Sequence, residues 1–124
     1  MRLLLDTHTF LWWRVDEARL SPEVRAAIGG AESVFVSMAT AWEIAIKVSM
    51  GKLRMSGTVE ERLVASHFEP LPIGFRHMER VAILPFHHRD PFDRMLIAQC
   101  QVERLTLVTA DRRLQRYEVP FLWV

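Results

Sequence analysis

Four acidic residues, spread widely along the chain, are the strongest candidates for chemistry: Asp6, Glu43, Asp93 and Asp111. If their side chains meet, the carboxylates repel one another, and some stay protonated unless a cation neutralises them. Oxygen ligands alone favour a hard cation, Mg²⁺ or Mn²⁺, over zinc. Such ions usually act on phosphates, where they activate water and stabilise developing negative charge. The four acids therefore predict metal-assisted hydrolysis of a phosphoester.

The pattern of apolar residues and capping residues predicts the elements that must position these acids. Apolar or β-branched runs predict strands at residues 2–5, 33–37, 68–73, 105–109 and 119–124. Capping residues and helical periodicity predict helices at residues 7–13, 21–30, 38–50, 58–66, 74–83 and 90–103. The third strand is the weakest, because it contains two prolines.

Strands that alternate with helices predict an α/β fold, with a central parallel sheet of four to five strands and helices on both faces. Ligands of such sheets bind at the carboxyl ends of the strands. Asp6 directly follows the first strand, and Asp111 lies two residues after the fourth. We therefore expect the acids to converge at that edge.

The size and composition of the chain predict one domain, residues 1–124, in a reduced, cytoplasmic setting. A chain of 124 residues fits a single domain, and its one cysteine excludes an internal disulfide. No apolar run is long enough for a membrane span, and Asp6 interrupts the first one too early for a signal peptide. With 16 basic and 15 acidic residues, any RNA binding must use a local basic patch.

Four acidic positions also have purely structural interpretations, and among them Asp111, before two arginines, could open a short helix. Glu43 can pair with Lys47 one helical turn later. Asp93 can interact with the helix dipole, and Asp90 is well placed as an N-cap. Asp6 has no such structural interpretation. It directly follows a buried apolar strand, and no turn residue beside it would explain a charge at that position.

Four segments, in this order, resemble the PIN-domain family, and most closely the VapC-like ribonuclease toxins of toxin–antitoxin pairs. The segments are LLLDTHTFLWW at 3–13, SMATAWEIAIKVSMGKL at 37–53, HRDPFDRMLIAQC at 88–100 and LTLVTADRRL at 105–114. Each motif alone is weak, whereas the ordered set is specific. The fold of this family, a parallel sheet flanked by helices, agrees with the predicted elements.

The resemblance implies a role for each acid as a catalytic and metal-binding residue. Asp6 and Asp93 would bind Mg²⁺ most directly, while Glu43 and Asp111 would complete the ligand set, hold its waters or position a second ion. Three further residues would support the site: Thr7 and Thr109 through their hydroxyls, and Asp90 as a cap or beyond the direct ligands. The implied reaction is in-line attack of activated water on an RNA phosphodiester, which leaves a 5′-phosphate.

The resemblance also implies partners: an RNA substrate, a small antitoxin that is itself the link to DNA, and a second copy of the chain. Candidates for contacts to RNA phosphates are Arg112, Arg113, Arg116 and Lys47, although short charge runs are usually solvated. The aromatic cluster Phe10, Trp12 and Trp13 fits either a core or a partner surface. His87 and His88 are expected on a loop at the rim of the site, because adjacent histidines cannot easily share one metal.

Two alternative functions remain open on the sequence. One is a PIN nuclease with a housekeeping role in RNA processing. The other is a nucleic-acid-binding or assembly module in which the acids are structural. A complete acidic set disfavours the second alternative, and a neighbouring gene for a short DNA-binding protein would favour the toxin over the housekeeping nuclease.

Overall fold

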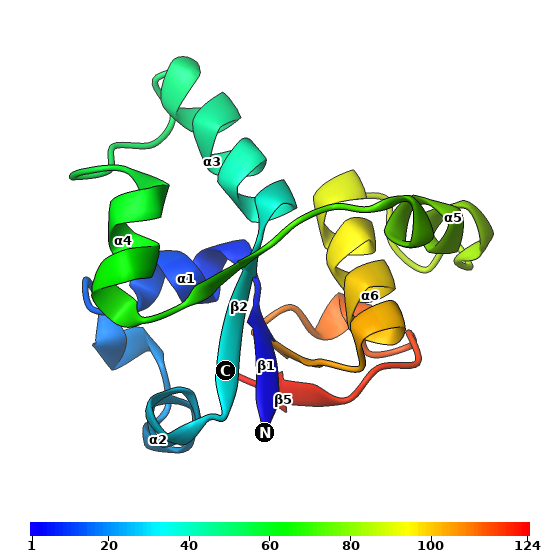
Figure 1. Ribbon diagram of the computed structural model, residues 1–124, viewed down its shortest axis with the longest axis horizontal. Helices are drawn as coiled ribbons and strands as arrows, with labels where there is room; N and C mark the ends of the chain where they lie inside the picture. Colours follow the sequence, from blue (N-terminus) through cyan, green and yellow to red (C-terminus); the bar gives the residue numbers. More distant parts are fainter.

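The computed structural model describes residues 1–124 and consists of one five-stranded sheet covered on both faces by helices (Figure 1). The elements, in chain order, are β1 (Arg2–Leu5), α1 (Thr7–Trp12), η1 (Glu17–Arg19), α2 (Pro22–Gly30), β2 (Ser33–Ser37), α3 (Met38–Ser49), α4 (Val59–Ser66), β3 (Glu69–Leu71), α5 (Phe75–Ile83), α6 (Pro91–Glu103), β4 (Thr106–Thr109), η2 (Arg112–Leu114) and β5 (Phe121–Trp123). The predicted α/β class is therefore confirmed.

The strand order is β3-β2-β1-β4-β5, and every neighbouring pair is parallel. The first strand lies at the centre, where its three leucines, Leu3 to Leu5, are completely buried. The proline-containing strand β3 lies at an edge of the sheet, which suits prolines because they lack an N–H to donate. Parallel pairing places the carboxyl ends of all strands on one side.

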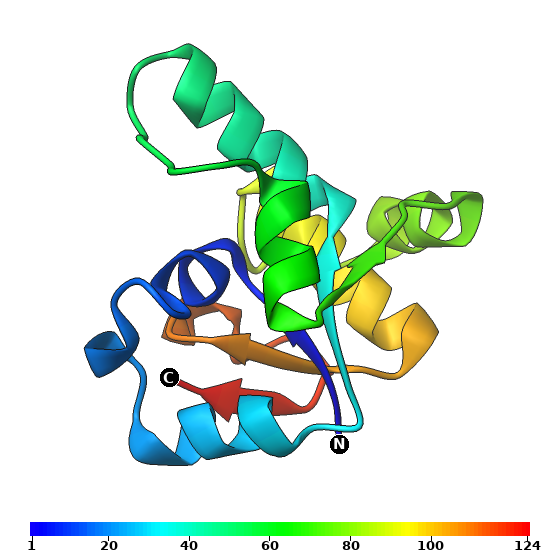
Figure 2. The same ribbon diagram turned by 60° about the vertical axis from the view of Figure 1, so that its left-hand side comes forward.

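Two hydrophobic cores fill the space between the sheet and the helices. Leu3 and Leu5 point into a core formed with α1, α2, α3 and α4, whereas Leu4 points into a core formed with α6 on the opposite face. This division follows from the alternation of side chains along a strand. Figure 2 shows α1, α2 and α4 on one side of the sheet and α6 behind it.

Local signals in the sequence account for most helix starts. Ser21 caps α2, which has proline in its first turn, and Thr58 forms a capping box with Glu61 at the start of α4. The main differences from expectation are small. Helix α1 ends one residue early with Trp13 as its C-cap, and the two weak strands are shorter than predicted.

None of the helices combines the length and the apolar character that a membrane-spanning segment requires.

Candidate active site

Asp6 occupies the junction between β1 and α1 and is only 6% exposed. Its Oδ1 atom accepts a hydrogen bond from the Thr9 N–H (2.9 Å), so the carboxyl caps α1. Its Oδ2 atom accepts a hydrogen bond from the Thr109 hydroxyl (2.6 Å), at the end of β4. Burial raises the pKa of Asp6, and these hydrogen bonds oppose that rise. The side chain is thus held in one orientation at the centre of the carboxyl edge.

Glu43 is connected to Asp6 through the neighbouring threonine. The Thr7 hydroxyl donates to Glu43 Oε1 (2.6 Å) and lies 3.3 Å from the Thr40 hydroxyl. The other carboxylate oxygen of Glu43 pairs with Lys47 Nζ at 3.2 Å. The pair expected from the helical spacing therefore forms, but Glu43 also contacts the segment that carries Asp6.

Asp93 lies in the first turn of α6 beside a histidine and a second aspartate. Asp90 is the N-cap of this helix, as expected, because its Oδ1 accepts hydrogen bonds from Phe92 N (2.8 Å) and Asp93 N (3.3 Å). His88 Nε2 lies 3.1 Å from Asp93 Oδ2. One potential ligand atom from each of His88, Asp90 and Asp93 lies within 4.8 Å of the others.

The electrostatic setting of Asp93 is unfavourable for its ionised form. Burial, followed by the charge of Asp90, raises the pKa of Asp93 to about 6, while the hydrogen bond with His88 lowers it. The charge of Asp6 adds to the rise. Asp93 and Asp6 are therefore close enough for their charges to interact.

Asp111 follows β4, and its environment favours the ionised carboxylate, in contrast to that of Asp93. Its backbone N–H donates to the Thr109 hydroxyl (3.0 Å), the same hydroxyl that holds Asp6. The Arg113 guanidinium binds both carboxylate oxygens (2.9 and 2.8 Å) and thereby lowers the pKa of Asp111. Asp111 Oδ2 also lies 3.9 Å from His88 Nε2.

The structure brings the four predicted acids to the same edge of the sheet, linked by a chain of contacts rather than packed in one compact cluster. The tightest group is His88, Asp90 and Asp93. Sequence reasoning assigned His88 only to the rim and did not single out Thr9, although Thr9 follows Asp6 by three residues, the spacing of a helix N-cap and the N–H that it binds. The position of His88 two residues before the Asp90 cap is the one local signal that could have indicated its contact.

The donor set around Asp6 and Asp93 fits a divalent cation. Burial is the main cause of the raised pKa values of both groups, and the charges of Asp90 and Asp6 add to the rise at Asp93, so the ionised carboxylates are unfavourable where they lie. A cation between them would stabilise the ionised forms, and carboxylate oxygens favour Mg²⁺ or Mn²⁺. The histidine nitrogen nearby is a ligand that Mn²⁺ tolerates better than Mg²⁺.

The candidate phosphate-binding cations differ in how strongly they are engaged. Arg113 and Lys47 are paired with Asp111 and Glu43. The Arg112 guanidinium lies over the Trp123 ring, 4.4 Å from its centroid, and Arg116 is exposed. Two of the four candidates therefore neutralise acids of the site instead of extending into solvent.

The chain matches known proteins in both sequence and fold. The family model described as PIN domain matches residues 3–120. Ribonuclease VapC22 of Mycobacterium tuberculosis is 29% identical over 121 residues, which cover 95% of this chain and 93% of the relative.

Among solved structures, VapBC2 from Rickettsia felis bound to a promoter DNA fragment superposes with a TM-score of 0.71 at 15% identity, covering 98% of both chains. FitAcB from Neisseria gonorrhoeae superposes with a TM-score of 0.66 at 21% identity, covering 97% of this chain and 96% of the other. At such identities the superpositions show a shared fold. Because the family model spans nearly the whole chain, from Leu3 in β1 to Pro120 just before β5, this protein belongs to the PIN-domain family.

Proposed function

We propose that this protein is an Mg²⁺- or Mn²⁺-dependent endoribonuclease and the toxin of a toxin–antitoxin pair in the cytoplasm. The observation that carries the proposal is the placement of buried Asp6 and partly buried Asp93 at the carboxyl edge of a parallel sheet, close enough for the charge of Asp6 to raise the pKa of Asp93. RNA as the substrate class is supported by the similarity to a relative named as a ribonuclease.

Each acid has a role that follows from its contacts. Asp6 and Asp93 would hold the ion directly, while Glu43 and Asp111 would complete the set and hold water near it. When bound, Mg²⁺ or Mn²⁺ neutralises the charge that develops on the phosphate and makes water more acidic. Thr109 keeps Asp6 oriented through its 2.6 Å hydrogen bond, and Thr7 does the same for Glu43.

Basic residues beside the acids bind the RNA backbone. Arg112 and Arg116 lie on either side of the paired Arg113, on the segment that follows β4, and both are exposed, so they add positive charge beside Asp111. Phosphate contacts of this kind position a nucleic acid without reading its sequence. Arg113 and Lys47, which pair with Asp111 and Glu43, would add positive charge for phosphate beside the acids.

The decisive experiment is cleavage of an RNA panel by purified protein with Mg²⁺, with Mn²⁺ and with EDTA. Asp6→Asn and Asp93→Asn should each abolish cleavage, and EDTA should do the same. Glu32→Gln is the matched control, because Glu32 is an exposed acid just before β2, at the opposite edge of the sheet. Cleavage that survives in both aspartate variants would refute the assigned site, and folded wild-type protein, freed of antitoxin, that cuts no RNA would refute the function.

A groove between α1, α3 and α4 is suited to the antitoxin. The cavity has a volume of about 450 Å³, and its lining combines apolar side chains with cations, among them Leu11, Trp12, Leu53, Arg19, Lys52 and Arg62. Such a lining favours a segment with apolar and acidic side chains. Solved complexes of the same fold are described as toxin–antitoxin or VapBC assemblies, which supports a protein partner of this kind.

Co-expression tests this partner. A short protein encoded beside this gene should suppress RNA cleavage and co-purify with the chain. Arg62→Glu should weaken the complex, because it places a negative charge in the groove, whereas the free variant should still cut RNA. A neighbour that binds the variant as tightly as the wild type would place the antitoxin elsewhere.

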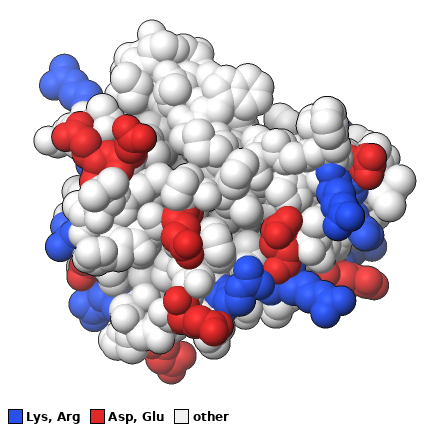
Figure 3. Space-filling model, viewed as in Figure 1, with Lys and Arg blue, Asp and Glu red and all other residues white.

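An apolar surface on α3 is suited to a second copy of the chain. Trp42 is 63% exposed, Met38 one turn earlier is exposed as well, and Phe92 packs edge-on against Trp42 at a centroid distance of 5.4 Å. In Figure 3 the charged side chains lie toward the two sides and the lower half, while the upper middle, where Figure 1 places α3, shows none. Exposed aromatic clusters of this kind are typical of interfaces. We therefore propose a homodimer that uses Met38, Trp42 and Phe92.

A further inference from the structure

Arg94 is a buried cation that has no carboxylate partner. The side chain follows Asp93 directly in α6 and is 5% exposed. Its guanidinium donates hydrogen bonds to the carbonyl oxygens of Val81 (3.2 Å), Leu84 (3.4 Å) and Pro85 (2.9 Å). A buried guanidinium is costly to desolvate, so its retention here calls for a function that an apolar side chain would not serve.

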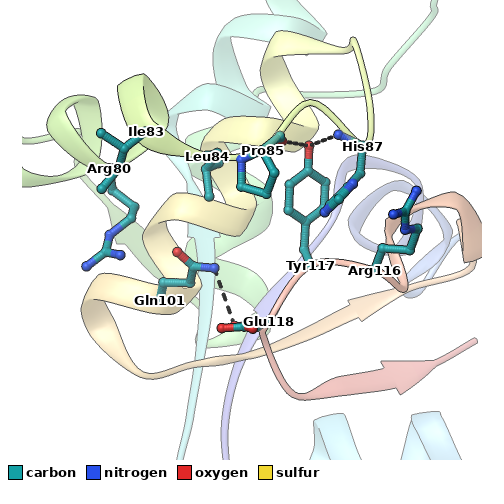
Figure 4. Close-up of a pocket in the computed structure, with 9 residues that line it drawn as sticks. All are labelled: Arg80, Ile83, Leu84, Pro85, His87, Gln101, Arg116, Tyr117 and Glu118. Atoms are coloured by element: carbon teal, nitrogen blue, oxygen red, sulfur yellow. Dashed lines mark hydrogen bonds between the residues drawn. The ribbon is translucent and has the colours of Figure 1, made fainter.

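The fourth partner of Arg94 is the hydroxyl of Tyr117, at 3.0 Å. This hydroxyl donates to the Pro85 carbonyl (2.8 Å) and accepts from the backbone N–H groups of His87 and His88 (both 3.2 Å). Figure 4 shows the Tyr117 ring between Pro85 and His87, with its hydroxyl directed at the loop. The loop between α5 and α6 is therefore fastened at several backbone atoms by two side chains.

This loop carries the histidine that contacts the acids. His88 Nε2 lies 3.1 Å from Asp93 Oδ2 and 3.9 Å from Asp111 Oδ2. We propose that Arg94 and Tyr117 are positioning residues for the active site, which fix His88 and through it the carboxylates of Asp93 and Asp111. The proposal rests on the proposed metal-dependent function and adds residues to which that function assigns no role.

A purely structural role would be to cap the last turn of α5. The carbonyls of Val81 and Leu84 belong to that helix end, and a cation is favourable there. That role does not explain Tyr117, because its hydroxyl binds the amides of His87 and His88, which lie beyond the helix. The two roles can therefore be separated by a change at Tyr117.

Tyr117→Phe removes the hydroxyl and leaves Arg94 with its three carbonyl partners, those of Val81, Leu84 and Pro85. In metal-free protein, the amides of His87 and His88 should exchange hydrogen at least about tenfold faster than in the wild type, while amides in α5 keep their rates. The dissociation constant for Mn²⁺, measured by titration calorimetry, should rise about tenfold, as expected when a partner of a metal ligand is lost. Gln101→Ala is the control, because Gln101 lines the same cavity of about 250 Å³ away from the hydroxyl (Figure 4).

A double-mutant cycle with His88→Ala tests whether Tyr117 affects Mn²⁺ affinity through His88. If Tyr117 acts through His88, Tyr117→Phe has no further effect on Mn²⁺ affinity once His88 is gone. A tenfold effect that persists in the His88→Ala background overturns the proposal, and so does a Tyr117→Phe protein with wild-type affinity. Wild-type protein that binds Mn²⁺ but cuts no RNA contradicts the ribonuclease function alone, whereas wild-type protein that binds no Mn²⁺ contradicts both proposals.

Discussion

The aspartates of the site differ in whether their environment favours or disfavours the ionised carboxylate. Asp6 is buried and Asp93 is partly buried, and both have pKa values raised above the ordinary range, whereas the bidentate contact with Arg113 lowers the pKa of Asp111. A cation therefore has most to gain by binding between Asp6 and Asp93, where charge is least compensated. Asp111 is already neutralised by its own arginine.

We predict that Asp93→Asn stabilises the metal-free protein at pH 8. The pKa of Asp93 rises from 3.8 to about 6 on folding, so the native state holds this proton more tightly than the unfolded chain. Stability therefore falls as pH rises through the window from 4 to 6, and an amide avoids a loss of about 1–3 kcal/mol at high pH. Urea unfolding in EDTA at pH 8 and pH 4.5 measures the gain, which should be largest at pH 8 and clearly smaller at pH 4.5.

Asp111→Asn provides a control of opposite sign for this prediction. Because the pKa of Asp111 is lowered on folding, its contribution to stability is present at neutral pH and is lost as pH falls through the acidic range. The asparagine variant should thus be less stable than the wild type at pH 8. If both variants shift stability in the same direction, the contrast between the two carboxyls is wrong.

We predict that Thr109→Val reduces RNA cleavage by about 10–100-fold, as is common when a residue that orients a metal ligand is lost. The change keeps the shape of the side chain and removes the hydroxyl that donates to Asp6 and accepts from the Asp111 N–H. The free energy of unfolding should fall by about 1–3 kcal/mol, since two buried partners lose a hydrogen bond.

Thr106→Val is the matched control for Thr109→Val. Thr106 begins the same strand, and its hydroxyl makes no contact with the site. Initial rates at saturating Mg²⁺ should be near the wild-type value for this variant. Equal losses in both variants would show that the effect comes from β4 as a whole.

At the scale of elements, the residues of the site are also the caps of the elements that present them. Asp6 caps α1, Asp90 caps α6 and Asp111 caps η2. A capping residue has non-helical backbone angles and lies just before the first turn of the helix. Its side chain is therefore held where the strand ends and the helix begins. The same hydrogen bonds that define the helix starts therefore orient the acids.

Helix α4 allows capping to be separated from catalysis, because its cap lies away from the acids. The Thr58 hydroxyl oxygen accepts a hydrogen bond from the Glu61 N–H (3.1 Å), and the Glu61 carboxylate accepts one from the Thr58 N–H (3.0 Å). We predict that Thr58→Ala lowers the free energy of unfolding by about 1 kcal/mol and leaves RNA cleavage unchanged. Ser56→Ala, at an exposed serine just before the cap, should change neither quantity in thermal unfolding and cleavage assays.

At the scale of the whole molecule, the apolar face on α3 remains uncovered although the chain has two well-filled cores. Ile44 faces the core from α3, whereas Met38 and Trp42 on the same helix are exposed. An apolar face beside polar surface is typical of an association site. This arrangement leads to a prediction about oligomeric state.

We predict that Trp42→Glu shifts the proposed homodimer toward monomer without unfolding it, because a charge at the centre of an apolar interface must be desolvated. Sedimentation velocity over a range of concentrations measures the effect, and circular dichroism checks the fold. Val64→Glu is the control, since Val64 is 72% exposed on α4 and should tolerate the charge. A dimer that survives Trp42→Glu would place the interface on another surface.

The amino-acid sequence alone determined the class of fold, the helix starts and the four acids. These features depend on neighbours within a few residues: the apolar run Arg2–Leu5, the caps Ser21 and Asp90, and the capping box at Thr58. Short-range patterns of this kind act before any tertiary contact forms. The edge position of the weak third strand also follows from the sequence, because its prolines disfavour a central position in the sheet.

Only the tertiary structure decided which partners each acid has. Thr109 and Asp6 are 103 residues apart in the chain, Thr7 and Glu43 are 36 apart, and no local pattern records such contacts. The role of His88 depends on the path of a loop that Arg94 and Tyr117 hold in place. Side chains in a loop do not follow the period of 2 of a strand or the period of 3.6 of a helix. Their orientations are therefore set only when elements distant in the sequence pack together.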